Sequence, residues 1–162
     1  VFLPNDAAAN TQNGFGSATV TGDAGSELVS ITQNTKRDPN WSSNSVPAVS
    51  LSTATTKAAI PLILNDNSWR TAVVPYSLVD NNEITVKYVL ADADPATNTT
   101  TQVLTLDANE AGNFFAPNVL DPVGFTSGVA YIEGDGLFIA TGNLTQRTGK
   151  WINGSTPGLN YD

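Results

Sequence analysis

The strongest pattern of apolar and polar positions lies in residues 84–106, where two alternating runs flank a polar stretch. In the first run every second residue is apolar, which is the period expected of a half-buried β-strand. Asp92, Asp94 and Pro95 interrupt the alternation with residues that favour turns. The pattern therefore predicts a β-hairpin.

The register of this hairpin follows from its apolar residues. Pairing Val86 with Leu104 and Ile84 with Leu106 brings the large apolar side chains of both strands to one face of the sheet. We therefore expect this register, with the Thr and Lys side chains on the opposite face.

Two other pairs of apolar runs predict hairpins, because residues with strong turn preferences separate the two members of each pair. The first hairpin joins 15–21 to 27–32 through 22–26, and the second joins 60–64 to 69–74 through 65–68.

Residues 33–47 show neither strand nor helix periodicity, so we expect a long loop there.

Residues 129–140 predict a fourth hairpin, with Gly134 and Asp135 as its two-residue turn. Both faces of this hairpin are apolar. We therefore expect it either to lie between two packed layers or to bury one face against another subunit. The pairs set by the turn are Ile132 with Leu137, and Tyr131 with Phe138.

Helical periodicity is nearly absent from the chain. Residues 107–113 fit one short helical turn, with Asp107 as its cap and Glu110 three residues later. About 8 to 10 short strands separated by turn residues predict an all-β fold, an antiparallel β-sandwich or jelly roll. We expect an N-terminal arm at 1–14, one domain at 15–152 and a polar C-terminal tail at 153–162.

The composition restricts the chemistry that the protein can perform. The chain has no Cys, no His and no Met. Without thiol and imidazole it cannot use Ser-His-Asp or Cys-His catalysis, form disulfides or build the usual transition-metal sites. We therefore expect a protein that is not an enzyme and needs no cofactor.

The charge restricts the partners. The net charge is -8, and the basic residues are scattered, so the surface would repel nucleic acid. No apolar run reaches the roughly 18 residues that indicate a membrane span. Ser, Thr and Asn make up almost a third of the chain, a composition common on virion and extracellular proteins, where we expect this one.

The remaining chemistry depends on carboxylates. Calcium is the metal that suits oxygen ligands, and its candidate ligands are Asp92, Asp94 and Asp135. Turn formation alone also explains the presence of Asp at these positions. Two carboxylates are also sufficient for glycoside hydrolysis. The pairs to examine for that reaction are Glu83 with Asp107, and Glu110 with Glu133.

These observations favour a non-enzymatic structural subunit of a large assembly, such as a virion capsid or decoration protein or the subunit of an extracellular filament. Its partners would be copies of itself or a larger protein lattice. The alternative is a carbohydrate-binding, lectin-like module in which Trp41 and Trp151 stack on sugar rings and Asp or Asn bind hydroxyls. The candidate subunit contacts are Phe2, Leu3, Tyr131, Ile132, Leu137 and Phe138.

Overall fold

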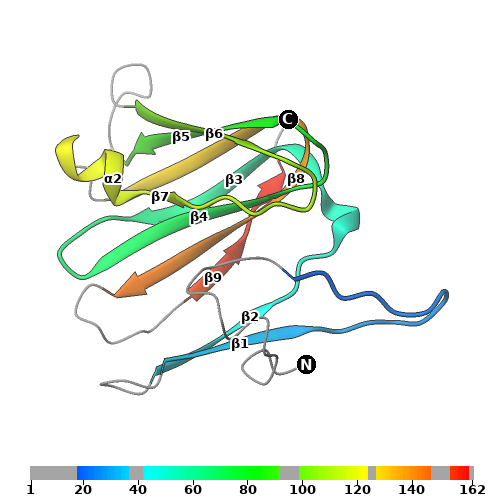
Figure 1. Cartoon of the computed structure of the whole chain (residues 1–162). Coiled ribbons are helices and arrows are strands. Elements are labelled where there is room, and N and C mark those ends of the chain that lie inside the picture. Colours follow the sequence, from blue (N-terminus) through cyan, green and yellow to red (C-terminus); the bar gives the residue numbers. More distant parts are fainter. Residues whose placement is uncertain (1–17, 37–41, 92–98, 124–126, 147–153, 161–162) are drawn as a thin grey trace.

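A computed structural model describes residues 18–36, 42–91, 99–123, 127–146 and 154–160. Within these ranges the fold is mostly antiparallel β-sheet with almost no helix, so the predicted all-β class is confirmed (Figure 1). The strands are β1 (Ile31–Lys36), β2 (Ser42–Pro47), β3 (Thr55–Leu64), β4 (Trp69–Ser77), β5 (Asn82–Leu90), β6 (Thr99–Leu106), β7 (Phe114–Phe115), β8 (Ser127–Gln146), β9 (Gly154–Pro157) and β10 (Leu159–Asn160). The helical turns are η2 (Leu51–Thr53), α2 (Pro117–Leu120) and η3 (Asp121–Val123).

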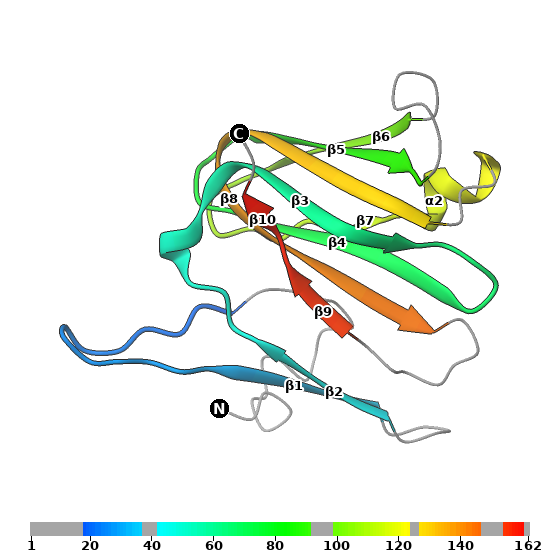
Figure 2. The same cartoon turned by 180° about the vertical axis from the view of Figure 1, so that it is seen from behind.

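The main sheet is organised around β8. Residues 128–134 of β8 lie between β3 and β5, and residues 138–146 pair with β4. β6 adds to the outer side of β5, while β9 pairs with the second half of β8 and β10 with β3. Figure 2 shows β9 and β10, in red, following one another between β3 and that second half.

The predicted hairpin at residues 129–140 is wrong, although the chain does change direction there. β8 is one continuous strand that bends sharply between its halves (Figure 1). The first half pairs with β3 and β5, and the second pairs with β4 and, at Phe138, with Thr55 of β3. No ladder joins Ile132 to Leu137 or Tyr131 to Phe138.

Backbone hydrogen bonds continue through the bend, which explains why no separate turn is needed. β5 provides the partner of β8 up to Gly134. Gly136 N then donates to Asn82 Oδ1 at 2.9 Å, and Leu78 N donates to Leu137 O at 3.0 Å. From the next residue β4 is the neighbour, so hydrogen bonds to Gly136 and Leu137 connect the part of β8 that pairs with β5 to the part that pairs with β4.

The β5–β6 hairpin forms, but its register differs from the prediction by two residues. Ile84 lies opposite Leu104 instead of Leu106, and Val86 lies opposite Gln102. A shift of two residues keeps every side chain on its predicted face. It leaves Leu104 37% exposed, while Leu106 is buried.

One cluster of buried apolar side chains forms the core, with members from both groups of strands that β8 connects. Tyr88 is fully buried there, and its hydroxyl donates to Gln102 Oε1 at 2.8 Å. Gln102 lies opposite Val86 in the observed register and is therefore the diagonal neighbour of Tyr88. Burial raises the pKa of Tyr88 well above its usual value.

The N-terminal third contains the largest departures from the sequence predictions. The predicted loop 33–47 contains most of β1 and all of β2, which pair antiparallel from Ile31 opposite Pro47 to Lys36 opposite Ser42. Within the predicted first hairpin, residues 18–30 have a turn but no strand, and Ile31 and Thr32 begin β1. In that turn Ser26 N donates to Asp23 O at 3.0 Å.

The turn at 65–68 is confirmed. Asp66 Oδ1 accepts hydrogen bonds from Ser68 N at 2.6 Å and Trp69 N at 2.7 Å, as its turn-forming composition predicts. The two strands that it connects then diverge, because β3 pairs with the first half of β8 and β4 with the second.

The predicted helical turn at 107–113 is not helical. Asp107 N donates to Glu110 Oε2 at 3.0 Å, so the predicted capping interaction forms around a tight turn. Short helical turns occur instead at η2, α2 and η3, so the expected limit of one is wrong for the described residues. The predicted polar tail 153–162 also contains β9 and β10 of the main sheet.

Candidate functional site

The predicted contact residues on β8 divide between core and surface. Ile132 and Phe138 are fully buried, so these two belong to the core and do not reach a partner in this conformation. Tyr131 and Leu137 are 38% and 46% exposed on the outward face. The side chains of β8 alternate between the two faces, so the predicted two-sided apolar hairpin does not form.

Several other candidates lie outside the described residues. They are Phe2, Leu3, Trp41, Trp151, Asp92 and Asp94. Asp135, the remaining calcium candidate, is exposed near the bend of β8. No group of three or more acidic residues that could hold a metal ion occurs in the described ranges.

One member of each predicted carboxylate pair, Asp107 and Glu110, has a local structural role. Asp107 Oδ1 accepts from Asn81 N at 3.2 Å, and Glu110 closes the turn after β6. Glu83 and Glu133 are both exposed on the outward face of the sheet. Glu133 lies opposite Lys57 of β3 and Thr85 of β5.

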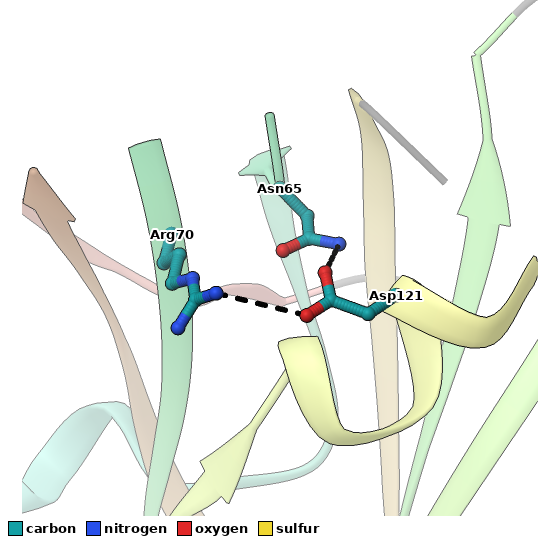
Figure 3. Close-up of polar contacts among 3 residues, drawn as sticks. All are labelled: Asn65, Arg70 and Asp121. Atoms are coloured by element: carbon teal, nitrogen blue, oxygen red, sulfur yellow. Dashed lines mark hydrogen bonds and ion pairs between the residues drawn. The ribbon is translucent and has the colours of Figure 1, made fainter. Parts of the chain in front are cut away.

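One polar cluster connects the β3–β4 turn to the helical segment (Figure 3). Asn65 Nδ2 donates to Asp121 Oδ1 at 2.9 Å, and Arg70 Nη2 lies 3.7 Å from Asp121 Oδ2. The Arg70 guanidinium also lies 5.9 Å from the centre of the Phe115 ring. The ion pair is partly exposed, so we expect a modest contribution to stability.

A groove of about 430 Å³ lies between the segment after β2 and the strands β8 and β10. Its volume suits a small ligand or an inserted side chain, but its lining contains no charged residue and offers only hydroxyl, amide and backbone groups for polar contact. The lining residues are Pro47, Ala48, Val49, Ser50, Thr53, Thr141, Gly158, Leu159 and Asn160.

The most unusual feature is the N-terminal extension, which we define as residues 18–36 and 42–47. Figure 1 shows residues 18–30 as a loop projecting from the body, and β1 and β2 as a separate two-stranded ladder. The extension contacts the body where the hydroxyls of Thr19 and Tyr76 lie 3.1 Å apart and where β2 meets β9. Val29 and Ile31 are 92% and 66% exposed.

Sequence reasoning missed this extension because its strands, rich in Thr, Ser and Asn, lack apolar alternation.

Comparison with known protein families, curated proteins and solved structures finds no match to this chain. Among the described helices, none is long and apolar enough to cross a membrane. The function must therefore be inferred from the chain's own residues.

Proposed function

We propose that this protein is a non-enzymatic structural subunit of a large assembly, and that it contacts copies of itself or a larger lattice through the N-terminal extension. A virion shell or an extracellular filament is the setting that its uncharged polar composition favours. The observation that carries the proposal is the exposure of the extension.

An isolated two-stranded ladder is marginally stable in water. Here β1 and β2 pair with each other and stand apart from the main sheet. The segment leading to them exposes the apolar side chains of Val20, Leu28 and Val29, and the first residue of β1, Ile31, is exposed as well. Exposed apolar surface concentrated on a projecting segment is typical of a region that is buried on a partner.

The proposal includes the arrangement of the main sheet. We propose that the strands around the first half of β8 and those around its second half form the two layers of a β-sandwich, with the core cluster between them. Support comes from the bend in β8 and from the core, to which β5 and β4 both contribute. Such a rigid body suits a subunit whose contacts are made by a projecting extension.

The test places a charge on the extension. We expect Val29→Asp to reduce self-association or lattice binding at least tenfold, because a carboxylate would have to be desolvated at the contact. Thermal unfolding of the isolated protein should be nearly unchanged, since Val29 is 92% exposed. Light scattering over a range of concentrations measures the association.

Leu62→Asp is the matched control, because Leu62 is 54% exposed on β3 of the body and gains the same charge. We expect this variant to associate like the parent protein. A strict monomer at all concentrations without affinity for a shell or filament would contradict the proposal. Equal loss of association in both variants would show that the extension has no special role.

A further inference from the structure

β6 is an edge strand of the main sheet. In the described part of the chain its ladder partner is β5, and its other side has none. Figures 1 and 2 both show β6 at the margin of the sheet. Val103, on its outward face, is 56% exposed, and Leu104, on the face toward the core, is 37% exposed. Both faces of β6 therefore leave apolar surface uncovered at this edge.

This edge lacks the features that usually prevent strands from pairing with other chains. Such features include charged side chains, Pro, bulges and short length. β6 has the sequence TTTQVLTL over eight residues, and its pairing with β5 has no register shift. By contrast, the edge strands β7 and β10 are two residues long, and β9 ends in Pro157.

We propose that β6 pairs antiparallel with β6 of a second copy of this chain, about a two-fold axis at Val103. An antiparallel pair is self-complementary about such an axis, and the main sheet then continues from one copy into the other. In this register Val103 meets Val103 of the second copy, and Leu104 lies opposite its Gln102. Both exposed apolar side chains of β6 are then covered.

Charge favours a second copy at this edge. Two copies of a chain with net charge -8 repel each other over most of their surfaces. β6 has no ionisable residue, whereas β3, β4, β5 and β8 all carry charges. It is therefore a long strand along which two copies can approach without placing like charges opposite one another.

The inference rests on the proposed assembly role only in that copies of the chain meet. It assigns a contact that does not involve the extension. The two proposals therefore make separate predictions, and different variants test them.

The absence of cysteine from the chain allows a direct test. Residues opposite each other in an antiparallel pair have Cα atoms about 4.5–5.5 Å apart, a separation that a disulfide can bridge. We expect Val103→Cys to give a disulfide-linked dimer under mild oxidation at micromolar protein concentration, visible on a non-reducing gel and lost with reductant.

Thr101→Cys is the matched control. In this register Thr101 lies opposite Thr105 of the second copy, and the two Thr101 positions are about 13 Å apart along the strands. We expect little cross-linking of Thr101→Cys, and efficient cross-linking of the double variant Thr101→Cys with Thr105→Cys. Equal cross-linking of Val103→Cys and Thr101→Cys would indicate random collision and overturn the inference.

A second pair of variants tests the contact without oxidation. Val103→Lys places two cations opposite each other at the axis, so we expect at least a tenfold weaker dimer by sedimentation. Thr85→Lys adds the same charge one strand inward, opposite Val103 on β5, and should leave the dimer intact. An unchanged dimer in Val103→Lys would overturn the inference.

The outcomes also separate the two proposals. Association that depends on Val29, without Val103→Cys cross-linking, overturns the β6 contact and leaves the proposed function standing. Cross-linking at position 103 with association insensitive to Val29→Asp supports the β6 contact and contradicts the role of the extension. A monomer that does not cross-link overturns both.

Discussion

Asn82 shows how one buried amide can replace a strand neighbour. Its side chain is almost fully buried, with Nδ2 donating to Ser77 Oγ at 3.0 Å and to Gly136 O at 3.2 Å. Its Oδ1 accepts from Gly136 N. The amide therefore satisfies both backbone groups of Gly136 at the bend of β8.

We expect Asn82→Ala to destabilise the protein by about 2–3 kcal/mol, because buried polar groups lose their partners and desolvation is no longer compensated. Chemical denaturation followed by tryptophan fluorescence measures this change. Asn113→Ala, at an exposed position, is the control and should cost less than about 0.5 kcal/mol. A similar small effect of both variants would show that the amide is dispensable.

The sequence offers no means of distinguishing Asn82 from the turn residues around it. Asn81 and Asn82 stand before an alternating run, where Asn usually indicates a turn. Asn81 has this role, with a positive φ of 52°. The role of Asn82 depends on Gly136, far along the chain, so local pattern alone does not predict it.

At the scale of elements, the sequence predicts the strands whose side chains alternate between buried and exposed. It does not predict which strands pair with one another. The β5–β6 hairpin was predicted on the correct faces but in the wrong register, because shifts of two residues preserve alternation. β1 and β2 were missed because their sequences, ITQNTK and SSNSVP, have few apolar residues and no apolar alternation. β9 and β10 were missed because their segment is short and rich in Gly and Pro.

The bend of β8 explains why Gly134 and Asp135 suggested a hairpin turn. Gly134 and Gly136 are needed for close approach and not for a left-handed backbone. A Cβ at Gly134 would lie 2.8 Å from Phe138 Cδ1, and a Cβ at Gly136 would overlap Val79 Cγ2. The same glycines therefore fit two structures, and local sequence does not choose between them.

A double-mutant cycle tests this packing. We expect Gly136→Ala to cost about 1–3 kcal/mol, because the added methyl group meets a stiff β-branched side chain. In a Val79→Ala background the same substitution should be nearly neutral or slightly stabilising, since Ala is favoured over Gly in extended backbone by about 0.5–1 kcal/mol. Equal costs in both backgrounds would show that Val79 is not the obstacle.

At the scale of the whole molecule, the acidic charge opposes association and the proposed contacts are apolar. The composition gives the net charge of -8 and excludes the usual His- and Cys-based chemistry. It did not predict where contacts lie. The candidate surfaces depend on the separate ladder of β1 and β2 and on the position of β6 at a sheet edge, both of which are set by long-range pairing.

We expect self-association to strengthen as salt increases, because screening reduces repulsion between copies of net charge -8. Sedimentation velocity at low and at about 0.5 M NaCl measures this effect, with a Debye length falling from about 30 Å at 0.01 M to about 3 Å at 1 M. Weaker association at high salt would instead indicate that ion pairs between copies hold the assembly.

The late position of β8 has a consequence for synthesis. β3, β4 and β5 all precede the strand on which they assemble. While the chain is being translated, those segments emerge before their common neighbour exists, and domains generally fold as units. A nascent chain that ends before residue 127 therefore has no central strand, and the main sheet can close only after β8 has left the ribosome.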